Sequence, residues 1–182
     1  MKIIETPLPD LLIIEPDIFG DKRGYFYESY NKKSFEQAGL NYDFVQDNQA
    51  FSQYGVLRGL HYQHPPYAQS KLIRAVHGEI NDVVVDLRKD SPTFGRWYGV
   101  KLNGDTHRQL LVPKGFAHGY AVLSAQTLVQ YKCDAYYHPE SEGGISPFDA
   151  ELDIDWGIPY EEAQLSDKDK THPAFKQCVN KF

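Results

Sequence analysis

The chain has 182 residues, a net charge of −6 and 41% hydrophobic residues, which suits one domain with a buried core. A pI near 5.6 argues against a nucleic-acid polymer as partner, because neutralising phosphates needs a basic face. No segment approaches the roughly 20 apolar residues that cross a bilayer. Cys133 and Cys178 lie far apart without a CxxC motif, which indicates reduced thiols. We therefore expect a soluble, cytoplasmic protein without a membrane partner.

The first forty residues predict short strands and one helix. An apolar strand, a turn, an aromatic strand and a helix are expected at residues 11–15, 19–24, 25–30 and 31–38. Asn31 is placed to cap the helix, and Gly39 to end it. We expect no other helix in the first half of the chain.

From residue 44 onward, strand follows strand with turn residues between them. We expect strands at 45–53, 56–62, 71–77, 79–87, 96–102, 108–113, 117–123 and 126–137. Many short strands with dense turns are typical of an all-β sandwich or barrel, most simply a jelly roll. The chain loosens after Pro139, and a small helical cap is expected at about 160–182. We thus predict one domain, residues 1–182, with a few short peripheral helices.

The stretch Gly55–Lys71 gathers three candidate functional side chains. His61 titrates near neutrality and suits proton transfer, while Arg58 and Lys71 are fixed cations suited to an anion or an oxyanion. Arg58 and His61 differ in strand parity, so they share a pocket only if the strand is irregular. Gly59 lies between them, and we predict a β-bulge there that turns Arg58 inward.

The spacing also resembles that of the metal-binding cupins, a family of small β-barrels. Gly55 precedes His61 as in their first motif, and Pro113, Gly115 and His118 match their second. However, Gln63 replaces one histidine ligand, and Lys71 stands in place of the glutamate ligand. A protonated lysine does not bind a divalent cation and repels it. We therefore expect a cupin-like barrel without a metal.

Six motifs together resemble the dTDP-4-dehydrorhamnose 3,5-epimerases over nearly the whole chain. They are Phe19–Gly24, Gln46–Asn48, Val56–Gln63 with Lys71, Pro113–Gly119, Tyr131 and Leu165–Asp169. The resemblance implies an isomerase that needs no metal and no cofactor. It would convert dTDP-4-dehydro-6-deoxy-D-glucose to dTDP-4-dehydro-L-rhamnose, inverting C3 and C5 beside the C4 ketone. It also implies a strand-swapped homodimer with residues of about 1–45 at the interface.

The resemblance assigns the acid–base roles. His61 would be the base, and Asp169 would orient it, with Asp167 as the alternative partner. Lys71 would stabilise the enolate oxygen, and Tyr131 would return a proton from the opposite face. We expect Lys71 to make the phenolate form of Tyr131 more accessible.

The dTDP group needs cations for its phosphates and aromatic rings for its base. Arg58 and, across the dimer, Arg23 would hold the pyrophosphate, and Phe19 and Tyr136 would sandwich thymine. Further positions match substrate contacts of the family: Glu28, Gln46, Asp47, Asn48, His118, Glu142 and Lys168. Asp82 and Asp86 lie in an apolar strand and are expected in buried networks.

Three alternatives remain open at this point. The chain could invert only one carbon of a dTDP-4-keto-6-deoxy sugar, because such relatives share the motifs. It could be a non-catalytic sugar-binding module, for which His61 would be dispensable. It could be a metallocupin oxygenase or isomerase, which would contain a stoichiometric metal.

Overall fold

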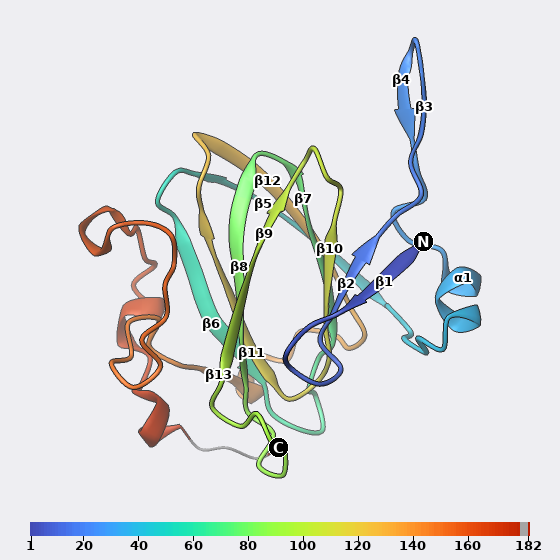
Figure 1. Cartoon of the computed structure of the whole chain (residues 1–182). Helices are drawn as coiled ribbons and strands as arrows, with labels where there is room; N and C mark the ends of the chain where they lie inside the picture. The colour runs from blue at the N-terminus through green and yellow to red at the C-terminus, as the bar shows by residue number, and fades with distance from the viewer. Residues whose placement is uncertain (179–181) are drawn as a thin grey trace.

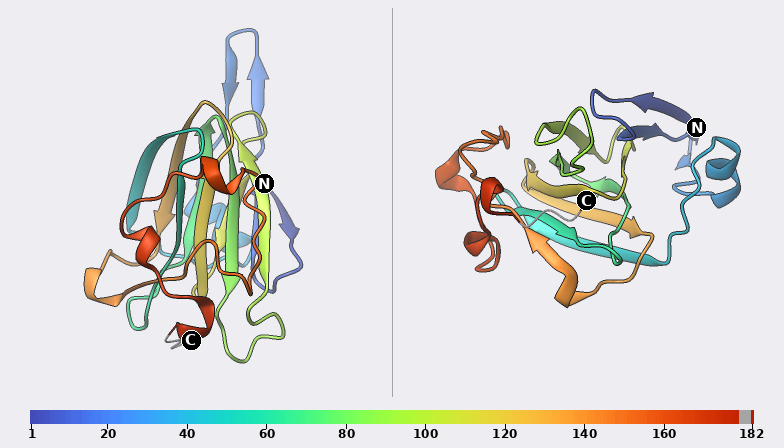
Figure 2. Two further views of the ribbon diagram at one scale, coloured as in Figure 1. Left: turned by 90° about the vertical axis from the view of Figure 1, so that its left-hand side faces the viewer. Right: turned by 90° about the horizontal axis from the view of Figure 1, so that it is seen from below.

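Two antiparallel sheets packed face to face form the body of the computed structural model, which describes residues 1–178 and 182 (Figures 1 and 2). The first sheet has the order β1 (Lys2–Glu5), β2 (Leu12–Glu15), β10 (Gln109–Val112), β7 (Lys71–His77), β12 (Gln126–Cys133), β5 (Gln46–Gln53). The second has the order β13 (Glu142–Gly144), β6 (Leu57–Gln63), β11 (Phe116–Val122), β8 (Glu79–Asp86), β9 (Trp97–Asn103). The predicted all-β, cupin-like jelly roll is confirmed.

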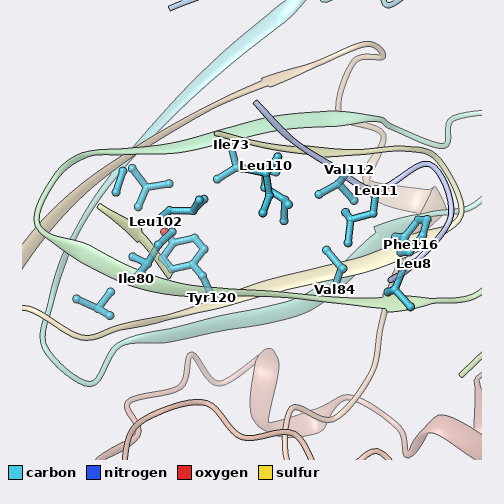
Figure 3. Close-up of a cluster of buried hydrophobic side chains, with 14 residues drawn as sticks. Leu8, Leu11, Ile73, Ile80, Val84, Leu102, Leu110, Val112, Phe116 and Tyr120 are labelled. Atoms are coloured by element: carbon cyan, nitrogen blue, oxygen red, sulfur yellow. The ribbon is translucent and has the colours of Figure 1, made fainter. Parts of the chain in front are cut away.

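Apolar side chains from both sheets fill the space between them (Figure 3). Ile73 and Leu110 come from the first sheet, Ile80 and Leu102 from the second, and all four are 0% exposed. Strand side chains alternate between two faces, so each strand contributes only every second residue to this layer. The rigid layer fixes the spacing of the two sheets.

The outer faces of the two sheets are covered by different parts of the chain. Helix α1 (Lys32–Gln37), capped by Asn31, packs Phe35 on the first sheet. The segment after β13 packs Ile145 and Trp156 on the second. The two coverings lie on opposite sides of the body (Figure 2). Within the described residues, no helix is long and apolar enough to cross a membrane.

The C-terminal segment is less helical than expected. Its helices are single 3₁₀ turns, η2 (Tyr160–Glu162), η3 (Asp169–Thr171) and η4 (Phe175–Gln177), after η1 (Pro139–Ser141). Residues 179–181 of the expected cap lie outside the described residues. The segment therefore holds its shape through packing and side-chain contacts rather than through helix length.

The predicted turn at residues 19–24 is confined to residues 22 and 23, and the strand predicted at 25–30 ends at Phe26. Strands β3 (Phe19–Asp21) and β4 (Gly24–Phe26) form a hairpin that projects from the body (Figure 1). The Asp21 carboxylate accepts a hydrogen bond from the Arg23 backbone N–H at 2.8 Å and closes the turn. The second strand is short because only β3 pairs with it.

The predicted strand at 126–137 ends early, at Cys133. Cys133 pairs with Gln46 and Lys71, the first residues of both neighbouring strands, so the chain has no strand partner beyond that point. Strands β1 and β13 were not predicted, because four and three residues give too little alternation to recognise.

The predicted bulge at Gly59 is confirmed. His61 pairs with His118, and Arg58 pairs with Tyr120, so two residues of β6 face one residue of β11. Gly59 has φ +133°, and a Cβ there would lie 2.6 Å from the Cα of Gly119. Only glycine fits this close approach.

Candidate active site

A cavity of ≈ 470 Å³ lies between the sheets and collects the predicted acid–base residues. His61 and His118 reach it from β6 and β11 of the second sheet. Lys71 and Tyr131 reach it from β7 and β12 of the first sheet. Arg58 also lines the cavity, because the bulge cancels its parity difference from His61. A bound ring would thus have groups from different sheets on its two faces.

Asp169 is the acidic partner of His61. Its Oδ1 lies 2.5 Å from His61 Nε2, and its side chain is only 4% exposed. Ser166 Oγ accepts a hydrogen bond from the Asp169 backbone N–H at 3.1 Å and fixes the start of this turn. Asp167 instead points to solvent and pairs with Lys170 at 3.1 Å. Of the two alternatives, the geometry therefore selects Asp169.

The contact with Asp169 engages only one of the two ring nitrogens of His61, Nε2. Burial by itself would raise the pKa of Asp169, but the hydrogen bond and charge of His61 hold that pKa below its usual range. Asp169 is therefore a carboxylate at neutral pH and accepts the Nε2–H of His61. The lone pair of a neutral His61 is then on Nδ1, where it can accept a proton.

Lys71 and Tyr131 are neighbours on the opposite wall. Lys71 Nζ lies 5.9 Å from the centroid of the Tyr131 ring. Burial lowers the pKa of Lys71, although negative groups around it oppose the shift. Burial raises the pKa of Tyr131, so the expectation of a more accessible phenolate is wrong. The Tyr131 hydroxyl is therefore protonated at neutral pH.

Asp82 and Asp86 both lie in buried hydrogen-bond networks, as the sequence predicted. His118 Nε2 lies 3.0 Å from both oxygens of Asp82, which is 0% exposed. Asp86, equally buried, accepts hydrogen bonds from Arg88, Ser91 and Thr93. Asp82 orients a cavity histidine, whereas Asp86 joins a network outside the cavity lining.

A second hollow of ≈ 230 Å³ shares His61, Lys71 and Tyr131 with the first. Gln46, Asn48 and Glu142, all predicted substrate contacts, line it. Glu142 is bonded by Lys168 Nζ and, at 2.7 Å, by the Tyr137 hydroxyl. Burial would raise the pKa of Glu142, but these hydrogen bonds keep it below its usual value. The two hollows form one polar surface next to His61.

Five predicted contacts lie elsewhere in the single chain. Phe19 and Glu28 line a separate hollow of ≈ 570 Å³ near the N-terminus, and Arg23 pairs with Asp21 on the hairpin. Asp47 pairs with Lys132 at 2.8 Å, beside a third hollow. Tyr136 is 70% exposed and lines none of the hollows described above.

Sequence reasoning missed three residues that the structure places at or near the site. Tyr137, the neighbour of Tyr136, lines the smaller hollow, and Tyr120 lines the larger. His172 lies 3.4 Å from Asp169. Strand parity from Tyr131 could have favoured Tyr137 over Tyr136, whereas nothing in the sequence signals His172.

His61, Asp169 and His172 are also of metal-ligand type, with one donor atom each within 4.8 Å of the others. Two ligands at about 2.1 Å from a tetrahedral zinc ion lie about 3.4 Å apart. The 2.5 Å between His61 and Asp169 is too short for that and fits a hydrogen bond. Gln63, at the position of a cupin ligand, bonds backbone carbonyls of Tyr67 and Tyr136 instead. The residues present do not fit a metal centre.

Comparison with known proteins identifies the family. The family model described as dTDP-4-dehydrorhamnose 3,5-epimerase matches residues 5–177. The chain belongs to this family. The Shigella flexneri dTDP-4-dehydrorhamnose 3,5-epimerase is 53% identical, over 93% of each chain.

Solved structures of such epimerases superpose closely on the chain. The Elizabethkingia anophelis protein gives a TM-score of 0.94 at 52% identity, covering 99% of this chain and 98% of the other. The Legionella pneumophila enzyme, in complex with dTDP-4-keto-L-rhamnose, gives 0.92 at 51% identity, covering 97% and 93%. A 3′-monoepimerase from Streptomyces bikiniensis, bound to dTDP-quinovose, is 34% identical with a TM-score of 0.85, covering 93% and 85%.

Proposed function

We propose that the protein is a dTDP-4-dehydrorhamnose 3,5-epimerase, converting dTDP-4-dehydro-6-deoxy-D-glucose to dTDP-4-dehydro-L-rhamnose in rhamnose biosynthesis. The observation that carries the proposal is the position of His61 and Tyr131, which line one cavity from opposite sheets. Inverting a carbon next to a ketone requires a base on one face of the ring and an acid on the other. This arrangement supplies both.

In the proposed mechanism, His61 Nδ1 removes the proton from the carbon next to the ketone. The electron pair moves to the carbonyl oxygen, where the Lys71 ammonium stabilises the enolate. The Tyr131 hydroxyl then donates a proton to the opposite face of that carbon. Asp169, 2.5 Å behind His61, stabilises the imidazolium that forms. Proton exchange with solvent restores His61 and Tyr131, and the same cycle at the second carbon completes the reaction.

We propose that Arg58 binds the pyrophosphate, since its guanidinium is held at the cavity by Ser52 Oγ at 3.2 and 3.3 Å. His118, Glu142 and Lys168, with Gln46 and Asn48, would contact the sugar or the nucleotide. Tyr136 remains a predicted stacking partner of thymine. Its neighbour Tyr137 is a second candidate, because in the single chain Tyr137 and not Tyr136 lines the hollow next to His61.

We further propose that two copies complete the site. The hairpin aromatics Phe19, Tyr25 and Phe26 are 61–67% exposed, and such exposure is typical of a protein contact surface. A swapped hairpin would bring Phe19 and Arg23, with nearby Glu28, to the cavity of the other copy. Residues 1–45 would then form the interface of a single domain, with the C-terminal segment as its cap. The two unpaired cysteines support a cytoplasmic location.

Solvent deuterium incorporation tests the function. The protein is incubated in D₂O with the dTDP-4-keto-6-deoxy sugar, and NMR follows label and configuration at C3 and C5. Label with inversion at both carbons is expected. Label at one carbon would favour a single-carbon epimerase, and absence of turnover that does not change with His61→Ala would favour a binding module. Activity that is lost on chelation and regained with metal would favour a metallocupin.

A further inference from the structure

His172 lies behind the catalytic pair, outside the cavity that His61 lines. Its Nε2 is 3.4 Å from Asp169 Oδ1, the same oxygen that lies 2.5 Å from His61 Nε2. The rings of His61 and His172 meet edge to face, with centroids 5.4 Å apart and planes at 76°. One carboxylate oxygen is therefore placed between two imidazoles.

The sheet leaves space for this ring at Gly144. A Cβ on Gly144 would lie 2.2–2.4 Å from three ring atoms of His172, so no other residue fits there without moving the ring. Gly144 pairs with His61 across β13 and β6. Strand β13, which pairs with the strand that carries His61, therefore also provides the space for the His172 ring.

His172 is buried without a well-formed hydrogen bond at Nε2. Its side chain is 10% exposed, and among the described residues Nε2 has no partner of good geometry. A buried donor without a partner costs about 1–3 kcal/mol, so such a group needs an explanation. Hydrogen bonds that serve catalysis are often long in the free enzyme and shorten when substrate binds. The 3.4 Å contact to Asp169 fits that description.

The charges around His172 favour a neutral ring. Burial lowers its pKa, the positive charges of His61 and Lys168 lower it further, and Asp169 only partly opposes them. A neutral imidazole can donate a hydrogen bond to Asp169 without placing a second cation beside the imidazolium of His61.

We propose that His172 is a positioning residue that donates its Nε2–H to Asp169 Oδ1 and holds this carboxylate in line with His61 as His61 takes up the substrate proton. The proposal rests on the proposed epimerase function. It does not depend on whether one or two carbons are inverted, because His61 is the base in either case.

The test compares four folded proteins in the deuterium assay: wild type, His172→Phe, His172→Gln and His172→Asn. Phe keeps the ring shape without the donor, Gln can reach Oδ1 with an amide N–H, and Asn is too short to do so. We expect Phe and Asn to lower kcat about tenfold, a part of the 10²–10⁴-fold that proton-transfer groups contribute. KM should stay within about twofold, because His172 does not line the cavity, and Gln should recover most of kcat.

A double-mutant cycle with Asp169→Asn separates positioning from packing. If His172 acts through Asp169, its replacement should have little further effect once the carboxylate is gone. Equal losses in the Gln and Asn variants, an additive cycle, or unchanged kcat in the Asn variant would each overturn the proposal. If Phe does not fold, the Gln and Asn pair decides. A wild type without turnover would overturn the epimerase function itself, which is a separate result.

Discussion

Replacing Asp169 with Asn removes the negative charge behind His61 and keeps the size of the side chain. Asn also offers an amide N–H to His61 Nε2, which favours the ring tautomer with its proton on Nδ1. That tautomer has no lone pair directed to the substrate. We expect the variant to fold and to bind the sugar nucleotide, but to lose most proton abstraction.

The size of the loss follows from the geometry. Asp169 is 4% exposed and lies only 2.5 Å from His61, whose side chain is 30% exposed, so water has little access to the side of the imidazolium that faces the carboxylate. Losing one partner of such a buried charged pair costs about 3–5 kcal/mol. At about 1.4 kcal/mol for each tenfold change in rate, kcat should fall about 10²–10⁴-fold.

The assay is the rate of deuterium incorporation at C3 and C5, with Asp167→Asn as the matched control. Both variants lose one negative charge, but Asp167 is fully exposed and, among the residues that the structure describes, pairs only with Lys170. The control should retain the wild-type rate within about twofold, because exposed ion pairs contribute little. If Asp169→Asn keeps more than a tenth of the wild-type kcat, or if both variants lose activity equally, the assignment of Asp169 is refuted.

Three other changes test the acid, the bulge and a buried network. Tyr131→Phe should lower inversion at least about 10²-fold while leaving some base-side exchange without inversion, as NMR would detect; normal inversion would remove Tyr131 as the acid. Gly59→Ala should lower the free energy of unfolding in urea by about 2–4 kcal/mol, because its Cβ would lie 2.6 Å from the Gly119 Cα; an unchanged midpoint would contradict the bulge geometry. Burial alone would raise the pKa of Asp86, but hydrogen bonds from its neighbours lower this pKa below the ordinary value of 3.8. The carboxylate therefore stabilises the fold fully above pH 3.8, and this stabilisation is lost as the pH falls through the lower pKa of the folded state. Asp86→Asn should therefore cost about 3 kcal/mol near neutral pH and reduce the acid-induced loss of stability; identical unfolding curves at pH 7 and pH 3 for both proteins would contradict this.

Much of the body could be predicted from the sequence, because strand alternation and turn residues are local signals. The strands from β5 to β11 lie within a residue or two of their expected ranges. The bulge could also be predicted, because Arg58 and His61 have different strand parity and so cannot share a face of a regular strand, and Gly59 lies between them. The hairpin was missed because Phe19–Gly24 has the composition of a turn, and its pairing depends only on β4.

The site could be predicted less well where it depends on contacts between residues that are far apart in the sequence. His61 and Asp169 are 108 positions apart, and the sequence spacing alone did not rank Asp169 above Asp167. The pKa of Tyr131 is raised by burial between the sheets. From the sequence, only the positive charge of Lys71 could be taken into account, and this burial could not be foreseen. Tyr136 was chosen over Tyr137 from the family resemblance, and parity does not decide between them because the strand pairing ends at Cys133.

The carboxylate that orients the base belongs to neither sheet. The segment that carries it is fastened near Gln164, whose backbone bonds to Gly55 and Leu57 at 2.8 and 3.0 Å. Gentle heating or limited proteolysis that detaches this segment would leave the two sheets folded but the enzyme inactive. The turnover rate would then fall before the circular dichroism signal of the strands changes. Turnover is therefore the more sensitive measure of an intact structure.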